Sequence, residues 1–129
     1  AYCVVLVFVA GIGFETMIDV ADAEGDRRTG VVTFATRYGA TLSSQVAAVF
    51  LSAAAILVVL LFFLPVESRL QWNTLFLAVA AAAALSNGLI SLKLIRGHTS
   101  SEVFALKRQA FFTLNTGVVA IVLGLMIAS

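Results

Sequence analysis

The sequence has little charge and almost no cysteine, histidine or proline. Asp, Glu, Lys and Arg make up 12% of its 129 residues, whereas a soluble domain carries about 25%. The formal net charge of +1 does not indicate a nucleic-acid partner. The single cysteine, Cys3, excludes a disulfide framework or a paired-cysteine metal site within one chain, and its apolar surroundings predict a packing role. In contrast, 61% of the residues are hydrophobic, a share typical of a membrane protein.

Four apolar stretches each approach the ~20 residues that a helix needs to cross a bilayer. They predict helices at about residues 1–25, 42–64, 73–95 and 103–128. The second is expected to stop at Pro65, which cannot continue a helix. The third contains Ser86, Asn87 and Gly88, small and polar residues that favour close helix contact and hydrogen bonding between helices. We expect an all-α integral membrane protein with four transmembrane helices, forming a single membrane domain over residues 1–129.

The basic residues predict the orientation, because Lys and Arg of short loops are retained on the cytoplasmic side. Seven of the eight fall around the first and third connections, and only Arg69 lies in the second. The seven are Arg27, Arg28, Arg37, Lys93, Arg96, Lys107 and Arg108. The first and third connections are therefore expected on the cytoplasmic side and both chain ends on the other. His98 is expected to be a solvated loop residue, with no acidic partner near it in sequence.

The opening of the chain resembles entry in the middle of a helix. It begins Ala-Tyr-Cys-Val-Val without an initiator Met, and its first basic residue is Arg27. A secretory signal peptide would place basic residues before a short apolar core. We expect the chain to be part of a longer protein or one half of a split one.

A row of acidic side chains stands at the end of the first apolar stretch. Glu15, Asp19, Asp22 and Asp26 are four, three and four residues apart, so on an α-helix they fall within an arc of about 60°. The row would rise ~16 Å from the embedded part of the helix to its cytoplasmic end. Glu24 falls on the opposite face.

The cost of this row indicates a cation site. A charged carboxylate at the centre of a membrane helix costs about 2.5–3.5 kcal/mol on insertion scales, and acids three or four residues apart repel one another. Mg²⁺ would remove both penalties, since it binds one or two carboxylates together with substrate phosphates. Arg27, Arg28 and Arg37 follow the row and could donate to phosphate oxygens, which predicts a diphosphate site. The alternative is a solvated helix end, where water alone satisfies the acids.

The stretch from Glu15 to Gly30, together with Thr33 and Arg37-Tyr38-Gly39, resembles the second aspartate-rich motif of the UbiA-type intramembrane prenyltransferases. The close similarity covers about 25 residues, and the remaining helices agree with that family in order and polarity. The resemblance implies that the four helices belong to the last part of a nine-helix bundle. It also implies transfer of a polyprenyl group from its Mg²⁺-bound diphosphate to an aromatic or lipid acceptor, such as a glycerol ether.

The resemblance assigns roles to individual residues of the row. Asp22 and Asp26 are implied metal ligands, Asp19 is a supporting catalytic acid, and Glu15 has a supporting role. Arg28 stands where the family has a basic residue near the diphosphate. The family's earlier motif, N-x-x-x-D-x-x-x-D, occurs nowhere in these 129 residues. We therefore expect a partial domain that lacks the amino-terminal helices. It should be inactive unless the rest of the chain or a partner supplies those helices.

Two other classes of function remain open at this point. One is a small proton-coupled transporter of four helices that uses Glu15 as a membrane-embedded switch. The other is a non-catalytic membrane subunit whose small residues, in Ala78–Ala84 and Gly117–Gly124, pack against partner helices. The transporter accounts for Glu15 but not for three further acids and two adjacent arginines at helical spacing.

Overall fold

The fold is all-helical and contains four long apolar helices, as the sequence predicts. A computed structural model describes residues 2–66, 68, 70–96 and 100–127. Within these ranges it contains five helices: α1 (Tyr2–Thr29), α2 (Phe34–Tyr38), α3 (Ala40–Phe63), α4 (Thr74–Ile95) and α5 (Ser100–Ile127). All but α2 are long and apolar enough to cross a membrane. The short helix α2 was not predicted. Arg69 and His98 lie outside the described residues.

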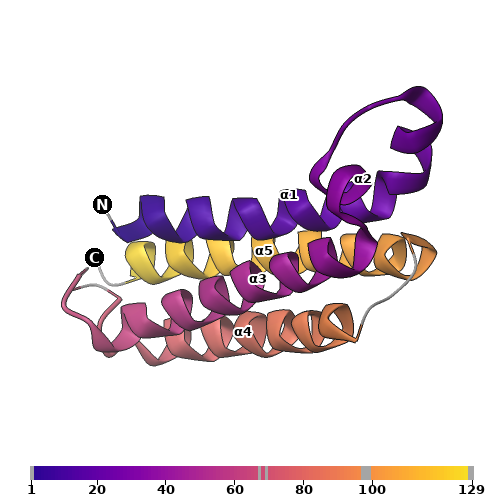
Figure 1. Cartoon of the computed structure of the whole chain (residues 1–129). Coiled ribbons are helices and arrows are strands. Elements are labelled where there is room, and N and C mark those ends of the chain that lie inside the picture. The colour runs from indigo at the N-terminus through magenta and orange to yellow at the C-terminus, as the bar shows by residue number, and fades with distance from the viewer. Residues whose placement is uncertain (1, 67, 69, 97–99, 128–129) are drawn as a thin grey trace.

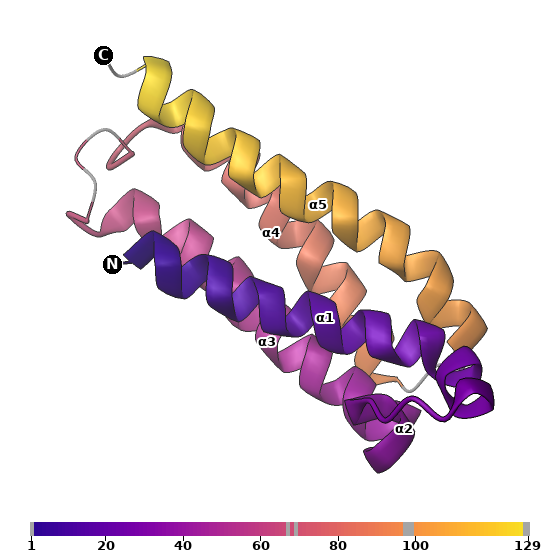
Figure 2. The ribbon, with the colours of Figure 1, turned by 90° about the horizontal axis from the view of Figure 1, so that it is seen from above.

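The four long helices lie side by side, and each runs antiparallel to its neighbours (Figures 1 and 2). Helix α1 packs against α3 and α5, and α4 packs against the same two helices. The start of α1 and the end of α5 lie at one end of the bundle, and α2 lies at the other (Figure 1). The end that carries α2 also holds the last turns of α1 and α4 and the first turns of α5, so all seven described basic residues gather there.

Helix α1 continues one turn beyond the predicted boundary near residue 25. Glu24 and Arg28 form an ion pair with 3.0 Å between Oε1 and Nη2, one turn apart on the exposed face, an arrangement that stabilises helices. The helix then ends at Gly30, whose φ of 74° lies in the left-handed region that glycine adopts at little cost. The backbone N–H of Val31 donates to the carbonyl of Asp26, which closes the end of the helix. The arginines of this turn are therefore helical rather than part of a loop.

The connection from α3 to α4 begins just before Pro65, as the sequence predicts. Helix α3 ends at Phe63, two residues before Pro65. The indole of Trp72 packs edge-on against Phe62 at a centroid distance of 5.3 Å. The side chain of Asn73 then accepts a hydrogen bond from the backbone N–H of Phe76 and caps α4.

Small residues allow the long helices to approach closely. A Cβ added at Gly13 would lie 3.0 Å from the backbone nitrogen of Leu51 on α3. Ser86 on α4 and Thr113 on α5 share a hydrogen bond of 2.8 Å, which confirms the predicted hydrogen bond between helices. The close contact predicted at Gly88 is absent, since nothing lies within 4 Å of a Cβ at that position among the described residues. Cys3 is exposed on the surface of the bundle, so it does not have the predicted packing role among the described helices.

We expect Gly13→Ala to destabilise the bundle by about 1–3 kcal/mol, because the added methyl group meets backbone atoms that cannot rotate away. Gly11→Ala on the same helix is the matched control, since nothing lies within 4 Å of a Cβ at that position. Denaturation of the purified protein with sodium dodecyl sulfate, followed by circular dichroism, measures the difference. Equal midpoints for Gly13→Ala and the unaltered protein would contradict the close contact.

Candidate functional site

The acidic row lies on one stripe of α1, because the helix is unbroken from Glu15 to Asp26. Glu15 is exposed, and the other three acids are half-buried. The row runs from the middle of the helix toward the end of the bundle that carries α2 and the basic residues. Each of the first three acids has a different environment.

Asp22 forms an ion pair with Lys107 of α5, a residue 85 positions away in the sequence. The ammonium nitrogen lies 3.1 Å from Oδ2 and 3.5 Å from Oδ1, so it contacts both carboxylate oxygens. The side chains of Lys107 and Asp22 are 30% and 44% exposed, and this partial burial strengthens the attraction relative to a fully solvated pair. In the sequence, Lys107 contributes only to the predicted orientation of the chain in the membrane. The only sequence feature that pointed to a role at the site was the position of Lys107 at the amphipathic start of the fourth apolar stretch.

Asp19 connects the row to α2. The backbone N–H of Phe34, the first residue of that short helix, lies near the Asp19 carboxylate and favours the charged form. The start of α2 is fixed further by Thr33 and Thr36, whose side chains each accept a hydrogen bond from the other residue's backbone N–H. Ala35 of α2 is fully buried. The row is thus held by α5 on one side, through Asp22, and by α2 on another, through Asp19.

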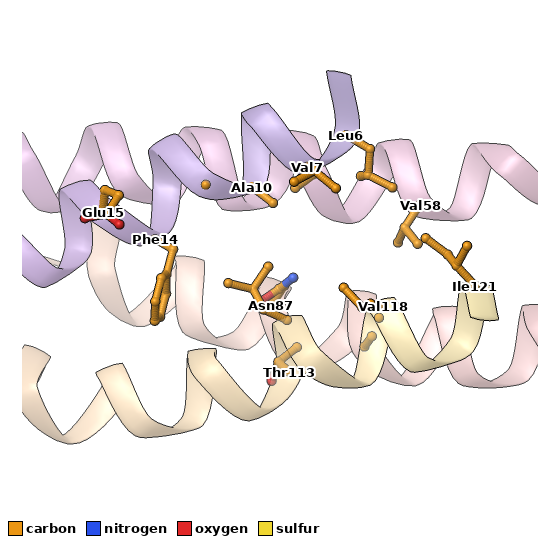
Figure 3. Close-up of a pocket in the computed structure, with 15 residues that line it drawn as sticks. Leu6, Val7, Ala10, Phe14, Glu15, Val58, Asn87, Thr113, Val118 and Ile121 are labelled. Atoms are coloured by element: carbon orange, nitrogen blue, oxygen red, sulfur yellow. The ribbon is translucent and has the colours of Figure 1, made fainter. Parts of the chain in front are cut away.

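Glu15, at the deep end of the row, lines a cavity of about 220 Å³ between the four long helices (Figure 3). Most of the lining is apolar, and Phe14 of α1 stands beside Glu15 at one end of it (Figure 3). Two polar residues complete the lining, Asn87 of α4 and Thr113 of α5. The Oδ1 atom of Asn87 is buried without a hydrogen-bond partner in the described part of the chain. The acidic row therefore leads from the basic end of the bundle to an apolar cavity.

The three predicted diphosphate-binding arginines share this end of the bundle, but in the described part of the chain no ion pair or hydrogen bond joins any of them to the row. Arg28 is two residues beyond Asp26, which places it about 200° around the helix, and it pairs with Glu24 instead. Arg27 is also exposed on α1. Arg37 lies on α2, with its guanidinium 5.5 Å from the ring centroid of Tyr38. In this structure the cation at the row is Lys107.

The side chains of the row can be compared with the ligands that a metal ion would need. Among the described residues, no group of three or more His, Cys, Asp or Glu side chains could hold a metal ion. Asp22 and Asp26 share a helix face one turn apart, and two carboxylates are what a protein commonly supplies to Mg²⁺ when substrate phosphates and water complete the octahedron. The pair fits Mg²⁺ bound together with a diphosphate, and does not fit a closed, all-protein metal site.

Comparisons of the chain with protein-family models, with curated proteins and with solved structures found no match. The structure itself establishes the fold class, an all-helical chain with four candidate membrane spans.

We expect Asn87→Leu to stabilise the protein by about 1 kcal/mol, because it removes a buried acceptor that lacks a donor and adds apolar atoms beside a cavity. Ser86→Ala, at the neighbouring residue, should instead destabilise by about 0.6 kcal/mol through loss of the hydrogen bond to Thr113. The same detergent denaturation measures both. Destabilisation by Asn87→Leu would show that the amide oxygen is engaged in the folded protein.

Proposed function

We propose that this chain is the carboxy-terminal part of an intramembrane prenyltransferase, which moves a polyprenyl group from its Mg²⁺-bound diphosphate to a lipid or aromatic acceptor. The observation that carries the proposal is the placement of Asp22 and Asp26 on one face of a membrane-length helix, at its basic end. Their sequence context resembles the second aspartate-rich motif of the UbiA-type enzymes. The solvated-end alternative explains acids near water, but not the half-buried ion pair of Asp22 with Lys107.

The division of the bundle into a charged end and an apolar interior supports the same function. A prenyl diphosphate has a charged head and a long apolar chain, so it needs both environments within reach of each other. We place the charged end, with α2 and seven basic residues, on the cytoplasmic side, in keeping with the bias of Lys and Arg toward cytoplasmic loops.

The chemistry divides among the residues as follows. Asp22 and Asp26 would hold Mg²⁺, and bound Mg²⁺ would neutralise charge on the diphosphate and make it a better leaving group. Asp19 orients the start of α2 beside the row through the Phe34 N–H. The apolar walls of the bundle exclude water, which protects an allylic cation from hydrolysis before the acceptor attacks it.

The metal site in this chain would be incomplete. The row supplies one set of carboxylate ligands, and the family's N-x-x-x-D-x-x-x-D motif, which would supply the facing set, does not occur in this sequence. Further helices of a nine-helix bundle, in the same chain or in a partner, would supply that set. By itself this chain should bind Mg²⁺-diphosphate more weakly than the complete bundle and transfer no prenyl group.

We expect Asp22→Asn and Asp26→Asn each to weaken Mg²⁺-dependent binding of a labelled polyprenyl diphosphate by about tenfold or more, since each removes a metal ligand. Binding to the purified chain in lipid nanodiscs, with and without a chelator, measures this. Glu24→Gln is the matched control, because Glu24 is exposed on the opposite face of the same helix and pairs with Arg28 one turn away. Retained binding in both aspartate variants, or none in the unaltered chain, would contradict the proposal.

A proton-coupled transporter is the second candidate, and the observation that favours it is that Glu15 lines the cavity between the four long helices. It predicts that Glu15→Gln abolishes substrate-driven proton flux in proteoliposomes while Asp22→Asn and Asp26→Asn leave the flux intact. The absence of any flux from the unaltered chain would exclude it.

A further inference from the structure

The Asp22 carboxylate already holds a cation that the protein supplies. The Lys107 ammonium lies within 3.5 Å of both carboxylate oxygens, which are the atoms that a divalent ion at Asp22 would need. Because both side chains are partly buried, this pair is not a fully solvated surface contact. An ion at Asp22 and the Lys107 ammonium would therefore compete for the same oxygens.

The surroundings of Lys107 give the ammonium a place to remain after it leaves Asp22. Phe104, three residues earlier on α5, presents its ring 5.7 Å from the ammonium nitrogen, within the range of a cation–π attraction. A lysine also has a flexible four-carbon stem and three donors, so its ammonium can move by a few ångströms without movement of α5. Phosphate oxygens of a metal-bound diphosphate would lie close to the carboxylate that the ammonium had left.

We propose that Lys107 is a positioning residue that substitutes for the metal at Asp22 and exchanges partners when the metal diphosphate binds. This inference rests on the proposed function. Without ligand, Lys107 neutralises Asp22. When Mg²⁺ and a diphosphate bind together, the ammonium leaves the carboxylate and donates to the diphosphate oxygens.

The exchange determines which ligand binds more tightly, the free metal ion or the metal diphosphate. Mg²⁺ alone must displace Lys107 and leave its ammonium without an anionic partner, so the free ion binds weakly. The metal diphosphate supplies a new anionic partner for the ammonium, so the ion pair that Lys107 loses at Asp22 is replaced by one with the diphosphate. Lys107 thus selects the complete metal diphosphate over the free metal ion.

The unaltered protein allows a direct test, because Lys93 and Lys107 are its only lysines. Acetylation of each amine by a water-soluble reagent, followed by mass spectrometry, reports how accessible it is. Saturating Mg²⁺ should raise the reactivity of Lys107, and inorganic pyrophosphate added with Mg²⁺ should lower it again. Lys93 is exposed on α4, outside the row, and should stay constant as the internal control. Constant reactivity of Lys107 across these conditions would overturn the exchange.

Substitutions provide an independent test. Lys107→Met removes the charge and keeps most of the stem, so it should tighten binding of Mn²⁺ alone by about tenfold and weaken binding of Mg²⁺-pyrophosphate by a similar factor. Lys107→Arg should restore much of the preference for the metal pyrophosphate. Arg108→Met is the matched control, because Arg108 is the exposed neighbour on α5. Electron paramagnetic resonance of Mn²⁺ and calorimetry with Mg²⁺-pyrophosphate measure the two affinities in the purified protein.

The outcomes separate this inference from the proposed function. If Mg²⁺-pyrophosphate binding depends on Asp22 and Asp26 but Lys107→Met changes neither affinity, Lys107 is a structural ion pair and only the inference fails. If the unaltered protein binds no metal pyrophosphate, or if Asp26→Asn leaves binding unchanged, the proposed function fails and the inference with it. Should Lys107→Met fold poorly in detergent, the acetylation test on the unaltered protein decides the matter alone.

Discussion

The electrostatic cost of placing carboxylates on a membrane-length helix is the constraint on which this structure depends. Helix α1 carries its acids on one stripe, and each charged group that is taken from water needs a compensating partner. Asp22 obtains the ammonium of Lys107, and Asp19 obtains the backbone N–H of Phe34. These contacts draw α5 and α2 to the row, so the same acids that suggest a function also help to fix how three helices meet.

Where the compensating cation comes from affects what the site can do. An arginine on α1 would move with the acids as one rigid unit, and Arg28 is committed to Glu24 in this way. Lys107 comes from a different helix through a flexible stem, so its ammonium can leave the carboxylate while the backbone stays in place. Two carboxylates, one removable cation and a nearby apolar cavity are suited to a ligand that brings its own metal, charge and apolar chain.

The candidate site was only partly predictable from the sequence. Spacing of four, three and four residues is sufficient to place the acids on one face, because helical geometry repeats locally. The same rule places Arg28 away from that face, and the proximity of the arginines in sequence was a poor guide to proximity in space. Lys107 could not be assigned to Asp22, since pairing across 85 residues depends on how α1 and α5 are aligned along their length. The cavity that Glu15 lines likewise requires four helices to be placed together.

The sequence by itself determined the class of fold. Apolar stretches of membrane length, Pro65 after α3, and polar segments between the helices are local signals, and each acts within a few residues. Only the tertiary structure decided which cation faces which acid, that α2 forms beside the row, and that the amide oxygen of Asn87 is buried without a partner in the described part of the chain. These features depend on the register between helices, which small residues such as Gly13 and the few interhelical polar contacts set, and register leaves no periodic trace in the sequence.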